Sequence, residues 1–282
     1  MDYVCNNFRN GMTKRLFIYA RLAIVFIMFM LPSVVDARDK GQKKRVYEYT
    51  QEYAFSGVRS IVVKSESSRF YRNRVTGHIE VQLIQSKDER VVVSIVRESD
   101  REVFKIEKIG NTLKLNAGDK DVEEAGHPDR PEAVVTVYTK DVNRLELGGA
   151  NELVASGYFT GRSLNLKIYG ASQVFGLSGR WNDLNVNLSG AADLSLVKVD
   201  VSNVGLEWQD AVECCISGKG KMLKVNASGS SDVNAENFVV KDVDAKLSGA
   251  ADITVNASGS IMYSLTGSAD LDWIGAPEII RK

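Results

Sequence analysis

The chain has 282 residues, with 36 Lys and Arg against 36 Asp and Glu, so its formal net charge is zero. A hydrophobic fraction of 44% is enough for a buried core, which argues against a disordered chain. Zero net charge argues against a protein that binds nucleic acid through bulk electrostatics. Three Cys are too few for a disulfide framework or a multi-cysteine zinc module, and two His leave little room for His-based catalysis or metal binding.

The first 37 residues have the pattern of a secretory signal peptide. A basic pair at residues 14–15 precedes an apolar run over residues 16–31, and residues 35–37 offer a small-residue cleavage site. The alternative is a retained membrane anchor, but Arg21 interrupts the run and leaves an apolar stretch too short to span a bilayer. We therefore expect an exported protein whose mature chain has no transmembrane span.

Two stretches precede the more regular second half of the chain. Residues 38–53 are highly charged and nearly free of aliphatic side chains, which predicts an exposed leader. Residues 54–140 contain short alternating or β-branched segments separated by turn residues, and no helical stripe of useful length. We expect irregularly arranged strands here, at residues 61–64, 79–84, 91–96, 103–106, 113–115 and 133–138.

The second half of the chain is an internal repeat. A five-residue motif, usually Gly, then Ala or Ser, a third residue, an acid and an aliphatic residue, recurs seven times in steps of 18 to 21 residues. An alternating strand precedes most copies, and another strand follows each of them. The seven copies occupy residues 149–153, 170–174, 190–194, 210–214, 229–233, 249–253 and 267–271.

The length and the strand-only character of this unit select one architecture. A leucine-rich repeat needs an asparagine ladder and a helical return arm, and a propeller blade needs about 40 residues. A β-helix coil fits, because each unit can wrap once and pair its strands with those of the next unit about 4.8 Å away. We predict an all-β domain over residues 54–277, a single-stranded parallel β-helix (a solenoid) of about seven coils over 141–277, preceded by the irregular strands of 54–140.

The fourth motif position carries the clearest candidate for a functional surface. Stacked carboxylates repel one another in a dry environment, so they must face water, bind cations or accept hydrogen bonds from turn amides. We predict a candidate ligand or cation face there, with a purely structural corner as the alternative. The residues at this position are Glu152, Gln173, Asp193, Glu213, Asp232, Asp252 and Asp270, of which the six acids form the candidate face.

The same repetition argues against catalysis. Every coil offers the same acid, and no second acid or base is singled out beside it, so we assign no catalytic residues, no metal ligands and no cofactor. The alternative is a carbohydrate-active β-helix enzyme that uses the repeat-corner carboxylates. A third possibility is a scaffold that bound cations stabilise.

Three further positions have specific expectations. The Gly that opens each motif is expected to take a positive φ. The fourth copy has Asp210 in place of that Gly and follows Trp208, which is either partly buried or an exposed contact residue. Residues 273–277 are expected to cap the C-terminal end of the solenoid.

Several segments together resemble a known family. They are Phe55–Ile61, Thr76–Leu83, Asn111–Leu115, residues 145–153, and the Leu-Ser-Gly-Ala-Ala-Asp blocks at 188–193 and 247–252. Over residues 54–275 the chain resembles the head GIN domain family, described as auto-transporter adhesins and common in Bacteroidetes. The resemblance implies a β-helical fold in an exported, envelope-associated protein, without catalytic residues. Asp210 and Gln173 depart from the pattern and indicate local irregularity.

These observations combine into one functional expectation. We expect an exported, non-enzymatic binding or structural module of the bacterial envelope, in the periplasm or at the cell surface of a Gram-negative bacterium. A solenoid presents long faces that suit extended ligands, so a glycan or an envelope protein is the expected partner, and nucleic acid is not. Unpaired strands at the ends of a β-helix also favour self-association.

Overall fold

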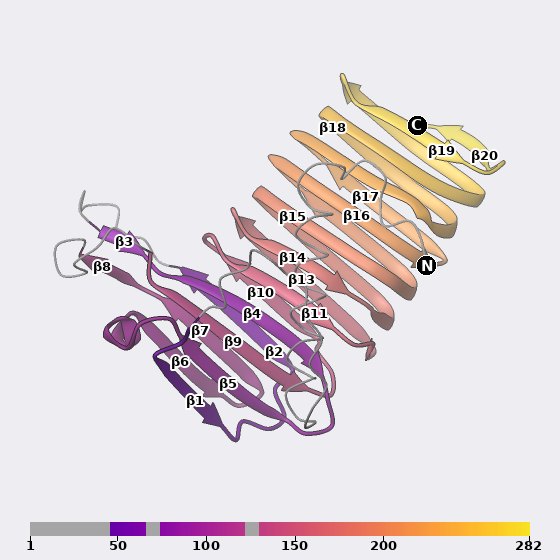
Figure 1. Ribbon diagram of the computed structural model, residues 1–282. Coiled ribbons are helices and arrows are strands. Elements are labelled where there is room, and N and C mark those ends of the chain that lie inside the picture. The colour runs from indigo at the N-terminus through magenta and orange to yellow at the C-terminus, as the bar shows by residue number, and fades with distance from the viewer. Residues whose placement is uncertain (1–45, 66–73, 122–129) are drawn as a thin grey trace, which may run out of the picture. The chain divides into compact units, whose positions relative to one another are not determined.

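The computed structural model describes residues 46–65, 74–121 and 130–282 (Figure 1). Strands dominate these ranges, as predicted, and they include one short 3₁₀ helix, η2 (Glu98–Val103). The predicted signal peptide and the first part of the predicted leader lie outside the described residues.

The repeat region is a parallel β-helix, and each of its coils contributes strand segments to three faces. Leu164 to Gly170 pair residue for residue with Leu184 to Gly190, which are the equivalent positions of the next unit. The prediction of a single-stranded parallel β-helix is therefore confirmed. Figure 1 shows the successive coils stacked in chain order from β10 to β20.

Face A is the longest of the three strand stacks. Its strands pair in parallel from coil to coil, with side chains alternating between the core and the outer surface. It consists of β2 (Ser60–Ser65), β10 (Arg144–Gly148), β13 (Ser163–Gly170), residues 183–190 and 203–208 of β15 (Gly179–Trp208), β17 (Met222–Ala227), residues 242–247 and 260–263 of β18 (Ser230–Gly267), and β20 (Glu278–Arg281).

Face B follows the motif corner in each coil, and face C closes the coil. Face B consists of β4 (His78–Gln85), β11 (Glu152–Ser156), β14 (Gln173–Leu177), residues 191–196 of β15, β16 (Ala211–Lys219), residues 230–234 and 252–256 of β18, and β19 (Asp270–Ile274). Face C is shorter and includes β12 (Phe159–Thr160), paired with residues 179–180, and the paired segments 199–200, 218–219 and 238–239.

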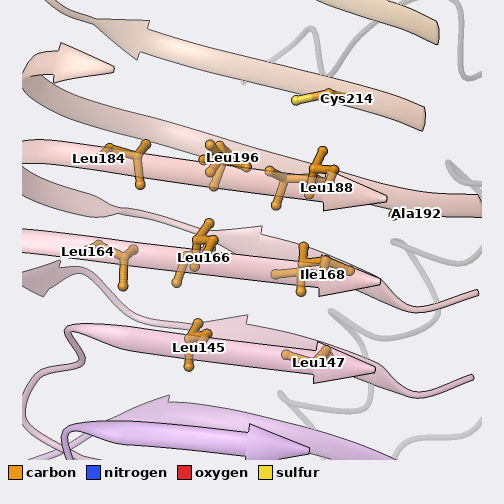
Figure 2. Close-up of a cluster of buried hydrophobic side chains, with 14 of the residues drawn as sticks. Leu145, Leu147, Leu164, Leu166, Ile168, Leu184, Leu188, Ala192, Leu196 and Cys214 are labelled. Atoms are coloured by element: carbon orange, nitrogen blue, oxygen red, sulfur yellow. The ribbon is translucent and has the colours of Figure 1, made fainter. Parts of the chain in front are cut away.

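The core is a set of aliphatic ladders that run through the stack. Leu145, Leu166 and Val186 occupy equivalent positions on successive strands of face A, and all three are buried. Figure 2 shows leucines of this face, together with Ala192, Leu196 and Cys214 of face B, as buried side chains of one cluster. Compact apolar side chains suit this position because each one packs against its own equivalents above and below.

The N-terminal part of the domain is more regular than the sequence indicates. Strands precede the solenoid as predicted, but β7 (Thr112–Ala117) pairs in parallel with β2, and β9 (Glu132–Thr139) pairs in parallel with β4. These pairs add two further rows to faces A and B. The sequence conceals them because their strands are not consecutive and lack the corner motif.

Antiparallel strands flank this end of the stack. β6 (Phe104–Ile109) pairs antiparallel with β7, β5 (Arg90–Ile95) pairs antiparallel with β9, and β1 (Tyr49–Tyr53) pairs antiparallel with β5. The predicted exposed leader thus ends too late at residue 53, because Tyr49 and Tyr53 pack against the core. A separate pair, β3 (Arg74–Thr76) and β8 (Asp119–Asp121), forms a two-stranded antiparallel sheet.

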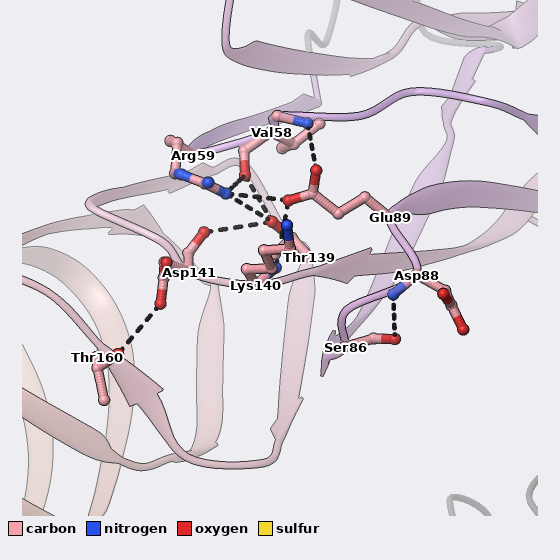
Figure 3. A network of polar contacts seen from close by, with 10 residues as sticks. Val58, Arg59, Ser86, Asp88, Glu89, Thr139, Lys140, Asp141 and Thr160 are labelled. Atoms are coloured by element: carbon pink, nitrogen blue, oxygen red, sulfur yellow. Dashed lines mark hydrogen bonds and ion pairs between the residues drawn. The ribbon is translucent and has the colours of Figure 1, made fainter.

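A partly buried polar network joins three segments of this region (Figure 3). The Glu89 carboxylate accepts hydrogen bonds from the Gly57 amide at 2.8 Å and from Arg59 Nη1 at 3.1 Å. The backbone hydrogen bond from Gly57 is the main cause that holds the pKa of Glu89 below its usual value. Thr139, which is fully buried, donates its hydroxyl to the Val58 carbonyl at 2.7 Å. The network connects Glu89, in the turn between β4 and β5, with residues 57–59, which precede β2, and it includes Thr139 at the end of β9.

The motif glycines have the backbone conformation that the sequence predicts. The six that open a corner, Gly149, Gly170, Gly190, Gly229, Gly249 and Gly267, have φ between 79° and 100°. A Cβ atom at Gly229 would lie 2.5 Å from the carbonyl oxygen of Asp210, the equivalent residue of the preceding coil. Glycine is therefore required by both the dihedral angle and the stacking.

Asp210 occupies the corner position without being glycine. Its φ is +76°, a region that Asp tolerates better than most residues. Its Oδ2 accepts a hydrogen bond from the Gly190 amide at 3.1 Å, so the side chain turns back to the preceding coil. The irregularity expected at this unit is accommodated within the stack.

The structure decides between the two alternatives given for Trp208 and places Trp273 in the last row of face B. Trp208 is 3% exposed and donates its indole N–H to Ser231 Oγ at 2.9 Å, so it is a core residue and not an exposed contact. Trp273 and Ile274 are 42% and 45% exposed, while Val255 beneath Trp273 is fully buried, so the cap at residues 273–277 stays a prediction. Trp273 is the register partner of Val255, so its side chain is on the core side of the last row. No further coil follows this row among the described residues.

The corner geometry gives a matched pair of substitutions. Gly229→Ala should lower the free energy of unfolding by about 1–3 kcal/mol from the unfavourable φ alone, and the clash of its Cβ with Asp210 should add to this loss. Gly205→Ala should change it by less than about 1 kcal/mol, because the new Cβ would lie 3.5 Å from its nearest neighbour at a φ that is not positive. Urea unfolding measures both, and equal losses would contradict the corner argument.

Candidate ligand-binding faces

The predicted acidic residues line up along face B at the motif corner. Neighbours along the row are register partners on adjacent parallel strands: Glu152 with Gln173, Gln173 with Asp193, Asp193 with Glu213, Glu213 with Asp232, and Asp252 with Asp270. Glu80 of β4 continues the row beyond Glu152. We call this row the acid ladder. Glu152, Asp193 and Glu213 are half-buried, whereas Asp232, Asp252 and Asp270 are exposed.

The carboxylates of the acid ladder influence one another. Partial burial raises the pKa of Glu213, and the neighbouring Asp193 and Asp232 carboxylates raise it further. Burial and the Asp252 carboxylate likewise raise the pKa of Asp232. Gln173 interrupts the run of like charges and donates its side-chain amide to Asp193 Oδ2 at 2.5 Å. Gln173 thus replaces a repulsion between two carboxylates by a hydrogen bond to Asp193.

The acid ladder supplies one carboxylate per coil and does not gather ligands at one point. Within residues 46–65, 74–121 and 130–282, no group of three or more His, Cys, Asp or Glu side chains could hold a metal ion. Its role as a ligand or cation face stays a prediction. The structural alternative for these acids stays a prediction as well, and Asp210, at the first motif position, does accept a backbone amide in this way.

A second candidate surface lies on the outer side of face A, across the corner from the acid ladder. A groove of about 830 Å³ crosses five successive coils between β15 and the C-terminal residues. One row of its side chains consists of Asn187, Glu207, Asn226 and Lys246, and the parallel row consists of Ser189, Gln209, Ser228, Ser248 and Thr266. We call this surface the face A groove.

The hydroxyl row of the groove is partly used by the fold. Ser248 donates its hydroxyl to the Ala227 carbonyl at 3.1 Å, and Ser228 donates to the Trp208 carbonyl at 3.3 Å. These bonds connect neighbouring coils and leave the hydroxyl oxygens directed at the groove as acceptors. The amide row adds donors and acceptors beside them, so the groove can bind a ligand rich in hydroxyl or amide groups.

The groove continues toward the first coils. A hollow of about 350 Å³ shares Asn187 and Glu207 with it and extends to Arg144, Asn165 and Lys167. Gly205 contributes to this hollow because it has no side chain at an outward position between Asn185 and Lys224. Sequence reasoning missed this surface, although alternating Asn residues in 164–168 and 184–188 mark its outward positions.

Removing one charge from the acid ladder should stabilise the fold. A raised pKa means that ionised Glu213 is disfavoured in the folded state, so the penalty exists at neutral pH and disappears as pH falls through the folded pKa toward the ordinary value of 4.5. We expect Glu213→Gln to raise the free energy of unfolding by about 0.5 kcal/mol at pH 7 and to change it little at pH 4. Urea unfolding at both pH values measures this effect. Glu236→Gln, an exposed acid outside the ladder, is the control, and a loss of stability in Glu213→Gln at pH 7 would contradict the argument.

No helix within the described ranges is long and apolar enough to cross a membrane. No curated protein matches the sequence of this chain. Several solved structures share its fold. A structure described as a putative adhesin from Parabacteroides distasonis has a TM-score of 0.65 at 16% identity, covering 83% of this chain and 96% of that one. A putative adhesin from Parabacteroides merdae has a TM-score of 0.62 at 12% identity, covering 83% and 95%.

A third structure has a different description. It is named a putative lipid binding protein from Parabacteroides distasonis, with a TM-score of 0.62 at 18% identity, covering 83% of this chain and 93% of that one. At these identities the likeness concerns the fold alone. The family model described as "Putative auto-transporter adhesin, head GIN domain" matches residues 69–277, which is most of the chain and includes every repeat. The chain belongs to the head GIN domain family.

Proposed function

We propose that this protein is an exported, non-enzymatic binding module of the bacterial envelope, and that the face A groove holds an extended glycan. The family and its structural neighbours support adhesion as the general role. The basic and apolar pattern of residues 14–37 supports export to the periplasm or the cell surface.

The observation that carries the ligand class is the composition of the groove. Its outward side chains are amides, hydroxyls and a few charges, presented in rows that repeat at the coil spacing of about 4.8 Å. A regular polymer with many hydroxyl groups matches such rows, because each repeat of the ligand can meet the same donors and acceptors. An acyl chain fits less well, because burying it there would leave polar groups without partners.

The groove also favours binding over glycan hydrolysis. Glycoside hydrolysis ordinarily uses two carboxyl groups on either side of the scissile bond. Among the described residues that line the groove, Glu207 is the carboxylate, and the acid ladder lies on the next face. The alternative of a carbohydrate-active enzyme would have to use the acid ladder, whose residues do not line the groove.

A glycan-binding assay tests the proposal. The purified protein is applied to a panel of immobilised envelope and host glycans, and the affinity for each bound glycan is measured. Asn187→Ala combined with Asn226→Ala should weaken binding roughly 10-fold, the effect of two lost hydrogen bonds of about 0.7 kcal/mol each. Both residues are outward on face A, so the thermal midpoint should not change.

Two controls decide between the functions. Asn237→Ala, an exposed amide outside the groove, should leave binding unchanged. Undiminished binding by the double variant would contradict the groove as the ligand site. Release of new reducing ends from a bound glycan, abolished by Asp232→Asn in the acid ladder, would instead establish the carbohydrate-active enzyme.

A further inference from the structure

The C-terminal end of the stack presents an open strand edge. β20 pairs in parallel with residues 260–263 of β18 along one side, and no strand within the described residues pairs with its other side. In Figure 1, β19 and β20 form the last row of the stack. At the opposite end the outermost strands are antiparallel to their neighbours: β1 pairs with β5, and β6 pairs with β7.

The last row also exposes apolar side chains that would be core in any earlier coil. Ile279 lies above Ile261, which is fully buried, yet Ile279 itself is 39% exposed. Trp273 lies above Val255 in the same way and is 42% exposed. A further layer of protein on this end would bury both side chains, which favours association.

The backbone of β20 determines which groups face the open edge. The Lys282 amide donates to the Tyr263 carbonyl at 2.9 Å, so it points into the stack. Because strand groups alternate in direction, the N–H and C=O groups of Ile279 and Arg281 point to the open side. The main-chain groups of Ile279 and Arg281 therefore remain available to pair with another strand.

The side chains of β20 are complementary to themselves in one antiparallel register. A two-fold axis perpendicular to the sheet places residues of the same face opposite one another, here with Ile280 on the axis. Ile279 of each copy then lies opposite Arg281 of the other, and these two residues exchange main-chain hydrogen bonds. On the outer face Glu278 meets Lys282, so opposite charges pair at both ends of the strand.

We propose that two copies of this chain associate end to end through antiparallel pairing of β20 with β20, with Ile280 on the two-fold axis. Ile280 is 38% exposed and lies on the outer face, opposite its own equivalent. Lys282 lies between Glu278 of the other copy and Asp244 of its own chain, to which its Nζ is 3.1 Å away. The strand pair alone buries less than a standard interface of about 1,600 Å², so the dimer should depend on concentration.

Cysteine cross-linking tests the register. In this arrangement the two copies of residue 280 form a pair without mutual hydrogen bonds, with Cα atoms about 4.5 Å apart, within the range that a disulfide spans. Under mild oxidation Ile280→Cys should give a covalent dimer, and Ile279→Cys and Arg281→Cys should each give several-fold less. The unsubstituted protein controls for the natural cysteines, and Val239→Cys controls for exposure alone, since Val239 is 49% exposed on face C.

Analytical ultracentrifugation of the full 282-residue chain provides the second measurement. We expect a monomer–dimer equilibrium without larger species, and a dissociation constant at least 10-fold higher for Ile280→Lys, which brings two like charges together on the axis. Val239→Lys should leave the dissociation constant unchanged. A monomer at every concentration, open-ended oligomers, or equal cross-linking at residues 280 and 239 would each overturn the proposal.

Discussion

The structure depends on residue-for-residue stacking of each coil on the next. Parallel pairing in register places every side chain on its own equivalent about 20 residues along the chain, so one position in the repeat has the same environment throughout. Aliphatic positions become continuous core ladders for this reason. Six of the seven corners carry glycine for the same reason, because the space for a Cβ atom there is taken by backbone atoms of the neighbouring coil, and Asp210 is the exception.

Stacking also determines what the surface can do. Repeated acids form a ladder in which neighbouring carboxylates raise the pKa of Glu213 and of Asp232, and Gln173 interrupts the run of like charges at one position. Repeated amides and hydroxyls on face A form a groove that no single coil could provide. Binding and self-association, as proposed for this protein, both use such extended features and require no singular catalytic residue.

The sequence predicts the parts of the structure that follow from repetition. The spacing of the corner motif is enough to predict the parallel solenoid, the positive φ of the corner glycines and the alignment of Asp193 with Glu213. Parts that depend on contacts between unlike segments escape it. β7 and β9 join the stack through strands that carry no repeat signal, and Tyr49–Tyr53 becomes a strand only because β5 offers an edge. Trp273 shows the reverse case, a core position that is exposed because no coil among the described residues covers it.

The central claim is that whole coils are interchangeable layers, and deleting one layer tests it most directly. Removing residues 191–210 joins Gly190 to Ala211 and takes out one complete repeat, including the irregular Asp210 corner. This variant should fold and unfold cooperatively, as measured by circular dichroism during heating, because every remaining strand keeps an equivalent partner. Removing residues 191–200, half a repeat, should abolish the transition. Unfolding of the first variant, or a normal transition in the second, would contradict the account.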